Sequence, residues 1–491
     1  MFHKQKIEYG DFQTPEHLAK EIAAFLYKTE LRPTMIVEPT CGTGSFIKAA
    51  VETFGAYPAY HAFDINADYL EQVKKSCSFH GMMLNVTRQD FFTYDWAAFF
   101  AQFLAENILV IGNPPWVTNA VLSALESANL PQKTNFQGHR GFDAKTGKAN
   151  FDIAEWMLMR LIESLQRNNA CIAMLCKTAT ARKTLQYAWQ KALNISQVSL
   201  YAIDAKAAFN VSVGACLFVA HIGKETRTME AAVYSGMQAA YKLSTFGWHD
   251  QQFIANIDEY QQVKDIAGIS CYTWRSGVKH DAARVMELTK TGEDFVNGLG
   301  EIVDIETEYL YPLLKSSDIG NNRLQPRKYV ILPQKNIGED TQCLEIHAPK
   351  TWEYLLRHAA MLDKRKSGIY KQRARFAIFG VGAYSFAPYK VAVSGLYKQL
   401  RFAVIGQSFE KPMMVDDTCY FIACSSHEEA QSLSHLLNTE ICRKFLHSLI
   451  FFDAKRPITK DILQRIDFNK LALRVNHSSP TLSTSFASCD G

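Results

Sequence analysis

Nowhere in the 491-residue sequence do about eighteen apolar residues follow one another, which is roughly the length that a membrane-spanning helix needs. Residues 1–6 carry charges with no long apolar stretch behind them, so no secretion signal is expected. The eleven cysteines are scattered, and no two have the two-residue spacing of a zinc knuckle or a redox motif. We therefore expect a soluble, cytoplasmic protein with reduced, mostly buried thiols, no membrane contact and no metal site.

An excess of charge of one sign is also lacking, because 53 Lys and Arg oppose 49 Asp and Glu, for a net charge of +4. So small an excess, spread evenly, gives no directed field for a nucleic acid. Residues 364–401 differ, since they contain nine basic residues and no acidic one. This run predicts either a surface that neutralises a phosphate backbone or a solvated basic face. The nine residues are Lys364, Arg365, Lys366, Lys371, Arg373, Arg375, Lys390, Lys398 and Arg401.

The length of the chain and its 47% hydrophobic content predict two domains, each with its own core. In the first domain, short apolar strands alternate with helical patterns, which indicates a Rossmann-like, doubly wound parallel sheet of the α/β class. From about residue 230 this alternation stops, and the chain appears as an irregular, mixed α+β domain. We place the domains at 1–228 and 229–480, followed by a Ser- and Thr-rich tail, 481–491, expected to be disordered.

The first domain is predicted to begin with a helix over 15–27, with Thr14 as its N-cap and Pro15 at its first position. Strands are expected at 35–38, 60–64, 85–87, 108–111, 170–176 and 213–220, and further helices at 46–53, 67–80 and 151–166.

A glycine-containing turn, Glu38–Phe46, joins the first strand to its helix. Gly42 and Gly44 let the backbone approach a ligand closely, but position 47 is Ile where a dinucleotide motif has its third glycine. An adenosyl or amino-acid site is therefore favoured over a pyrophosphate site. Asp64 ends the second strand, where an acid accepts hydrogen bonds from ribose hydroxyls. The alternative is an ordinary tight turn without a ligand.

The most specific element is Asn113-Pro114-Pro115-Trp116, directly after the fourth strand. Two successive prolines cannot continue a strand, so a functional loop is expected at this strand's carboxyl end. With the glycine turn and Asp64 before it, this order resembles the gamma group of N6-adenine DNA methyltransferases over about residues 10–225. The resemblance implies S-adenosylmethionine as cofactor, a catalytic domain at 1–228 and a target-recognition domain at 229–480.

The chemistry of an aromatic amine explains this loop. Its lone pair is delocalised into the ring, so an enzyme must favour a pyramidal nitrogen, and the Asn113 side-chain oxygen with the Pro114 carbonyl can accept its two hydrogens. Pro115 stiffens the loop, and Trp116 offers a surface for the base. Stacking contributes about 1–3 kcal/mol, comparable to the cost of flipping a base out of the duplex. By resemblance, Phe209 closes the other face of the base, although a core position is the alternative.

The resemblance also assigns the cofactor site, with Glu38 beside the methionine part and Asp90-Phe91 bordering the adenine. Asn150 resembles a further element of the pocket. The expected cofactor-binding residues are Thr14, Glu38, Pro39, Thr40, Gly42, Gly44, Phe46, Asp64, Ile65, Asp90, Phe91 and Asn113. The expected DNA contacts are Lys364, Arg365, Lys366, Lys371, Arg373 and Arg375.

The resulting hypothesis is a site-specific adenine N6-methyltransferase that acts on a flipped adenine in double-stranded DNA. Its expected role is to protect host DNA from a separately encoded restriction endonuclease, without a stable complex. A fused nuclease is not expected, because the cofactor segment already begins at Gln13. RNA adenine methylation and protein glutamine methylation remain alternatives, since both pose the same planar-nitrogen problem. Trp116 and the large basic domain favour a nucleic acid.

Overall fold

The structure is a computed structural model that describes residues 13–77, 81–117, 152–223, 226–239, 241–371, 373–408 and 410–478. It forms two compact units, Met1–Ile257 and Asp258–Gly491. None of the helices in the described part of the chain combines the length and apolar character needed to span a bilayer. The predicted pocket residue Asn150 and the tail 481–491 lie outside the described residues.

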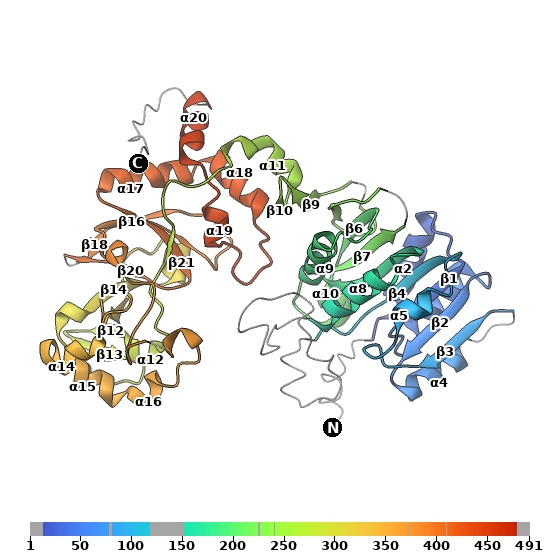
Figure 1. Cartoon of the computed structure of the whole chain (residues 1–491), viewed down its shortest axis with the longest axis horizontal. Helices are drawn as coiled ribbons and strands as arrows, with labels where there is room; N and C mark the ends of the chain where they lie inside the picture. Colours follow the sequence, from blue (N-terminus) through green and yellow to red (C-terminus); the bar gives the residue numbers. More distant parts are fainter. Residues whose placement is uncertain are drawn as a thin grey trace. The chain divides into compact units, whose positions relative to one another are not determined.

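Unit 1 is built on one ten-stranded sheet with the order β10-β9-β8-β6-β7-β5-β4-β1-β2-β3 (Figure 1). The strands are β1 Met35–Glu38, β2 Ala59–Asp64, β3 Leu84–Arg88, β4 Asn107–Gly112, β5 Asn169–Lys177, β6 Gln197–Ile203, β7 Ala215–Ile222, β8 Glu230–Tyr234, β9 Ser244–His249 and β10 Gln252–Ile254. The helices are α2 Glu16–Lys28, α3 Ser45–Phe54, α4 Ala67–Ser76, α5 Trp96–Phe100, α8 Ile153–Ser164, α9 Thr178–Gln190 and α10 Ala205–Phe209.

The sheet differs from the predicted parallel sheet on one side. Strands β1 to β5 pair in parallel, as expected, but β7 runs antiparallel to both β5 and β6. The predicted domain boundary at 228/229 was also too early. Strands β8, β9 and β10 continue the same sheet beyond β6, so unit 1 extends to Ile257. The sequence prediction missed α5, α9, β6 and α10, and it treated β8 to β10 as irregular chain.

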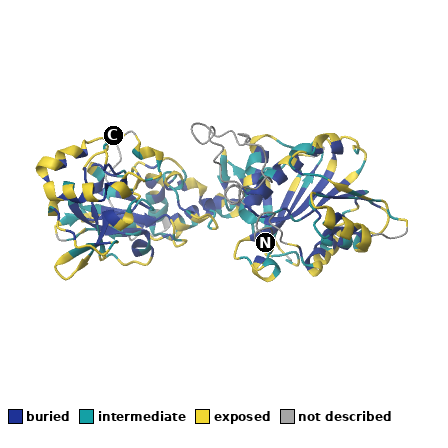
Figure 2. Ribbon diagram, turned by 90° about the horizontal axis from the view of Figure 1, so that it is seen from below, coloured by how far each residue is buried: buried dark blue, intermediate teal, exposed yellow. Residues whose placement is uncertain are grey.

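Two layers of helices cover the sheet of unit 1. On one face, α2, α3, α4 and α10 contribute to a core that includes Leu109 and Ile111 of β4. Because successive side chains of a strand point to opposite faces, the buried Ile108 and Val110 lie on the other face. There α8 packs against α5 and α9, and α9 packs against β5 and β7. Figure 2 shows the strands largely in the colour of buried residues, as a sheet covered on both faces requires.

The amino-terminal helix starts one residue later than predicted. Helix α2 has Pro15, not Thr14, as its N-cap, and the Pro15 carbonyl accepts hydrogen bonds from the backbone N–H groups of Leu18 and Ala19. Proline has no N–H to donate, so it is well suited to the start of a helix. Thr14 is buried just before the helix and makes no capping hydrogen bond there.

Unit 2 has mixed α+β structure with two main sheets, ordered β13-β12-β15-β14-β20 and β11-β21-β16-β17, and a short ribbon of β18 and β19. Its strands are β11 Arg275–Ser276, β12 Glu287–Thr291, β13 Asp294–Asn297, β14 Leu310–Leu314, β15 Lys328–Ile331, β16 Tyr389–Ser394, β17 Ala403–Ile405, β18 Gln407–Ser408, β19 Lys411–Pro412, β20 Met414–Val415 and β21 Cys419–Cys424. Its α-helices are α11 Ile257–Val263, α12 Ala283–Met286, α13 Ser316–Gly320, α14 Leu344–His347, α15 Pro349–Arg357, α16 Ala359–Leu362, α17 His427–Leu437, α18 Glu440–Leu449, α19 Lys460–Leu463 and α20 Phe468–Ser478.

The two sheets of unit 2 share a small core, in which Leu314 of β14 and Val415 of β20 join Ala392 of β16 and Phe421 of β21. Helix α17 packs on β16, β17 and β21. The described part of this region therefore has regular secondary structure where the sequence prediction expected an irregular chain.

Candidate active site

The glycine turn lies at the carboxyl ends of β1 and β2. Gly42 and Gly44 have φ angles of 51° and 86°, a left-handed backbone that favours glycine. The Asp64 carboxylate accepts a hydrogen bond from the Gly42 N–H at 2.8 Å and another from the Asn66 N–H at 2.8 Å. The acid at the end of β2 is thus fixed against the glycine turn, so the two motifs that the sequence analysis assigned to the cofactor lie together.

Glu38, the last residue of β1, joins the glycine turn to the loop after β4. Its side chain is only 2% exposed, and its Oε2 atom accepts a hydrogen bond of 3.1 Å from the Ile47 N–H in the first turn of α3. Burial raises the pKa of Glu38 well above its usual value; the Ile47 hydrogen bond opposes this, and the Asp64 charge adds to it. A methyl group on Gly112 would lie 3.5 Å from Glu38 Cγ, so the residue before Asn113 is close to Glu38.

The segment before α2 also reaches the glycine turn through Gln13, which is not among the predicted cofactor-binding residues. Gln13 Oε1 accepts hydrogen bonds from the Thr43 N–H at 3.1 Å and the Thr43 hydroxyl at 2.9 Å. Ion pairs of 2.9 Å, Glu16 with Lys48 and Lys20 with Glu52, hold α2 against α3. The predicted residue Thr14 is therefore placed beside the glycine turn by its neighbour in the chain.

Four further predicted cofactor residues fall into two groups. Asp90 follows β3, and its Oδ1 atom accepts a hydrogen bond of 2.9 Å from the Phe92 N–H, while Ile65 is exposed just after β2. Both lie at the carboxyl edge of the sheet, near Asp64. Phe91 is buried with its ring 4.9 Å from that of Trp96, and Phe46 is buried in the core of unit 1. The side chains of these two phenylalanines therefore contribute mainly to packing.

The Asn-Pro-Pro-Trp loop follows β4 at the same edge. Pro114 is buried, Asn113 is half-buried, and the Trp116 side chain is 7% exposed. The Trp116 ring meets the ring of Phe209, the last residue of α10, at a centroid distance of 5.1 Å and an interplanar angle of 64°. The sequence analysis expected these two aromatics on opposite faces of one base, and the structure brings their rings into direct contact.

The Trp116–Phe209 arrangement differs from the expected one in its geometry. A base held between two parallel rings needs them roughly 7 Å apart, which is two stacking contacts of about 3.5 Å. At 5.1 Å and in edge contact, the two rings leave no space for a base between them. One of them has to move before a base can stack on both.

Two charged residues that the sequence analysis did not assign hold the far end of this loop. Lys177, the last residue of β5, donates a hydrogen bond of 3.1 Å to the Trp116 carbonyl and lies 2.6 Å from Asp152 Oδ2. Asp152 caps α8 by accepting a hydrogen bond of 3.1 Å from the Ala154 N–H. No local motif marks either residue, because their contacts depend on the pairing of β4 with β5.

The predicted DNA contacts in unit 2 separate into two sets. Arg365 donates to the backbone carbonyls of Leu362 and Ala377 at 2.8 Å and of Arg375 at 3.0 Å, and the Arg375 side chain pairs with Asp363 at 2.8 Å. The prediction of DNA contact does not fit Arg365, whose guanidinium is used to hold its own loop. The other four residues are exposed and have no side-chain hydrogen bond or ion pair within the described residues: Lys364, Lys366, Lys371 and Arg373.

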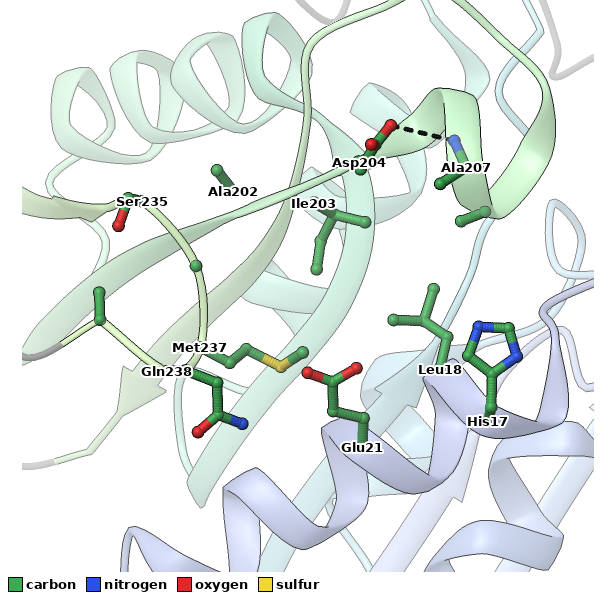
Figure 3. Close-up of a pocket in the computed structure, with 13 residues that line it drawn as sticks. His17, Leu18, Glu21, Ala202, Ile203, Asp204, Ala207, Ser235, Met237 and Gln238 are labelled. Atoms are coloured by element: carbon green, nitrogen blue, oxygen red, sulfur yellow. Dashed lines mark hydrogen bonds between the residues drawn. The ribbon is translucent and has the colours of Figure 1, made fainter.

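A hollow of about 520 Å³ lies between α2, the end of β6, α10 and the segment after β8. Figure 3 shows Glu21 and Leu18 of α2 on one side, Met237 on another, and Asp204 bonded to the Ala207 N–H at the start of α10. None of the sequence-predicted site residues lines this hollow. It lies at the carboxyl end of β6, and because β7 is antiparallel to both β5 and β6, this end is on the same edge of the sheet as the loops that carry Asp64 and Asn113.

This sheet order, with a glycine turn after β1, an acid at the end of β2 and an Asn-Pro-Pro-Trp loop after β4, is typical of one class of enzymes. The class is the Rossmann-like methyltransferases. The fold of the whole chain is similar to that of the type IIL restriction-modification enzyme MmeI in complex with DNA, with a TM-score of 0.54 at 11% identity. This match covers 99% of the present chain and 78% of that chain.

No model of a known protein family matches the chain. The chain is 44% identical over 472 residues to the type II methyltransferase M.NspV of Nostoc sp., a match that covers 96% of this chain and 98% of the relative. The chain therefore belongs to the type II DNA methyltransferases of restriction–modification systems.

Such an enzyme uses S-adenosylmethionine as its methyl donor, and the loops after β1 and β2 fit this molecule. The Thr40 hydroxyl is buried without a hydrogen-bond partner among the residues described, as expected where a ligand completes the site. Gly42 and Gly44 leave the backbone accessible, and the Asp64 carboxylate would supply acceptors for ribose hydroxyls. The residues that would hold the cofactor are thus in the turn 38–46, at Asp64 and at Asp90.

Proposed function

We propose that the protein methylates the exocyclic N6 amine of adenine at a specific site in double-stranded DNA, after the adenine has been flipped out of the helix. The observation that carries the proposal is the Asn113–Trp116 loop at the carboxyl end of β4, beside Glu38 and the glycine turn, with Phe209 against Trp116. In a restriction–modification system, this modification would protect host DNA from a separately encoded endonuclease.

The chain's own residues hold and prepare the amine. The Asn113 side-chain oxygen and the Pro114 carbonyl accept the two N–H hydrogens, which favours a pyramidal nitrogen with its lone pair directed out of the ring plane. When bound, S-adenosylmethionine supplies an electrophilic methyl group. With the cofactor held by the turn 38–46 and Asp64, the nitrogen would accept this methyl group from the cofactor's sulfur, and the extra proton on the nitrogen would pass to water.

The target base gains stacking energy from Trp116. A base–aromatic stack contributes about 1–3 kcal/mol, which partly offsets the few kcal/mol needed to extrude a base. Because Trp116 and Phe209 are in edge contact, base entry has to displace at least one ring. Four exposed residues of the basic run, Lys364, Lys366, Lys371 and Arg373, are the proposed phosphate contacts.

The test is methyl transfer from radiolabelled S-adenosylmethionine to unmethylated plasmid DNA, total RNA and protein in parallel, followed by nucleoside and amino-acid analysis. We expect label in DNA as N6-methyladenine. The same loop can hold the exocyclic amine of adenine or of cytosine. Label in DNA as N4-methylcytosine would therefore contradict the adenine assignment and retain the loop. Label only in RNA, or only on protein glutamine, would contradict the proposed substrate and retain the carboxyl-edge site.

A further inference from the structure

Lys177 connects the Asn113–Trp116 loop, here called the reactive loop, to the neighbouring strand β5. Strands β4 and β5 pair in parallel up to Gly112 opposite Met174, so their carboxyl ends lie together and Lys177 lies beside the Asn-Pro-Pro-Trp loop. The Lys177 ammonium donates to the Trp116 carbonyl at 3.1 Å and is 2.6 Å from Asp152 Oδ2. The Lys177 ammonium is therefore hydrogen-bonded directly to the backbone of Trp116, whose ring is the proposed stacking surface for the base and is here called the aromatic platform.

A second contact holds the next residue. The Ile153 N–H, in the first turn of α8, donates a hydrogen bond of 2.9 Å to the Val117 carbonyl. Asp152 is itself held, since its carboxylate accepts from both Ala154 N–H and Lys177. Burial raises the pKa of Asp152 by more than the Lys177 charge lowers it, in keeping with the burial of this carboxylate. The carbonyls of Trp116 and Val117 are thus fixed by two donors, the half-buried Lys177 ammonium and the buried Ile153 N–H.

The Trp116 side chain, in contrast, has no such anchor. Its indole N–H is buried and finds no acceptor among the residues that the structure describes. The ring is located by packing, including the edge contact with Phe209. The position of the platform relative to Asn113 therefore depends on the backbone of Trp116, which Lys177 holds.

We propose that Lys177 is a positioning residue for methyl transfer. Through its contacts with the Trp116 carbonyl and with Asp152, it holds the Trp116 ring where a base stacked on that ring presents its amine to Asn113. The inference rests on the proposed function for the identity of the base. Stacking falls off steeply with separation, since a gap of about 0.5–1 Å forfeits a quarter to a half of a contact's attraction. A misplacement of about 1 Å in an active site can lower the rate by about 100-fold.

The chain offers a matched control for Lys177. Lys183 lies on α9, which begins directly after Lys177, and pairs with Glu155 of α8 at 3.5 Å. A Lys183→Met variant removes the same charge from an ion pair with the same helix. The Lys183 charge also acts on Asp152, so this variant tests the loss of a nearby positive charge while it keeps the hydrogen bond from Lys177 to Trp116.

The first experiment observes Trp116 directly, without any substrate. The protein is labelled with 5-fluorotryptophan, and the ¹⁹F resonance of Trp116 among the seven tryptophans is assigned by its loss in Trp116→Phe. We expect Lys177→Met to shift or broaden this resonance, Lys177→Arg to restore it in part, and Lys183→Met to leave it unchanged. An unmoved Trp116 resonance in folded Lys177→Met would overturn the inference, whatever the substrate is.

The second experiment measures the reaction on the DNA site that the wild-type protein methylates. For Lys177→Met we expect kcat to fall about 10- to 100-fold with an unchanged KM for S-adenosylmethionine, and Lys183→Met to match the wild type. If Lys177→Met does not fold, Lys177→Gln is measured instead, because its shorter, uncharged side chain loses the ion pair with Asp152 and reaches less far toward the Trp116 carbonyl. An unchanged kcat also overturns the inference. Failure of the wild-type protein to methylate DNA would instead refute the proposed function, and the ¹⁹F result would still decide the role of Lys177.

Discussion

The reactive loop of unit 1 and the basic run of unit 2 differ in how far their sequences determine their roles. Residues of the reactive loop follow a central parallel strand, so their neighbours are the ends of the adjacent strands. Residues 364–375, the first part of the basic run, look uniform in sequence. In the structure, however, Arg365 binds backbone carbonyls of its own loop, Arg375 pairs with Asp363, and Lys366 is exposed. The position of a residue at a strand end therefore indicates what its side chain contacts, whereas membership of a run of like charges does not.

The largest expected effect tests the unit 1 side of this comparison. Replacing Asn113 by Ala removes one acceptor for the amine hydrogens where positive charge develops on the nitrogen. Loss of a single preorganised hydrogen bond of this kind lowers kcat by about 100- to 1,000-fold. We expect this loss in single-turnover methyl transfer, with the affinity for S-adenosylmethionine measured by calorimetry nearly unchanged. Asn85→Ala, at an exposed position on β3, is the control, and substantial activity in Asn113→Ala would remove Asn113 from the mechanism.

Unit 2 has its own buried charges, and their role is structural. Burial acts to raise the pKa of Glu287, but hydrogen bonds from His280 and Lys315, together with the Lys315 charge, lower it to about 2. The Lys315 ammonium lies 2.6 Å from Glu287 and 3.3 Å from Asp416. This network joins β12 and β14 to the turn before β21, where the two sheets meet.

The pH dependence of stability follows from this lowered pKa. The interactions of the ionised Glu287 contribute roughly 3 kcal/mol to the free energy of unfolding. This contribution is present above the ordinary pKa of about 4.5 and is lost as the pH falls toward 2. In urea unfolding, Glu287→Gln should be less stable than the wild type at pH 7, and the difference should shrink at pH 3. Glu353→Gln, in an exposed pair with Arg357, should show neither effect. An equal difference at both pH values would contradict a role for the Glu287 charge.

A smaller effect is expected from the aromatic platform. Replacing Trp116 by Ala removes a stacking surface worth about 1–3 kcal/mol, or roughly a 5- to 150-fold change in the fraction of extruded base. We expect lower 2-aminopurine fluorescence at the target position and weaker methylation, while Trp116→Phe retains most of both. If Trp116→Ala extrudes the base as well as the wild type does, Phe209 or another side chain must supply the surface.

Much of the site in unit 1 could be predicted from sequence because its motifs are local. Gly42, Asp64 and Asn113 each follow a recognisable strand, and parallel pairing brings these strand ends together. Lys177 could not be predicted, since its contact with Trp116 requires knowledge that β5 lies beside β4. The boundary near 228 was wrong because β8 to β10 are short strands whose sequences show no β–α alternation.

In unit 2, by contrast, the sequence indicated a mixed α+β region and a basic run, but not which cations are used internally. Arg365 illustrates the reason: its partners are backbone carbonyls, which every residue has, so no side-chain pattern marks the contact. The four exposed basic residues remain the predicted phosphate contacts, and single substitutions can separate the two sets.

The smallest expected effect concerns these cations and sharpens the comparison within one run. Lys366→Ala should lower the slope of log affinity against log salt for DNA by about 0.9, the value for one lost phosphate contact, with unfolding unchanged. Arg365→Ala should instead lower the free energy of unfolding by about 1–3 kcal/mol, because it leaves backbone carbonyls without donors. Arg375→Ala, which breaks an exposed ion pair, is the control and should change stability by less than about 1 kcal/mol. A salt slope that responds to Arg365 and not to Lys366 would reverse the assignment of the two sets, and would place the DNA on the face of the loop that carries the Arg365 guanidinium.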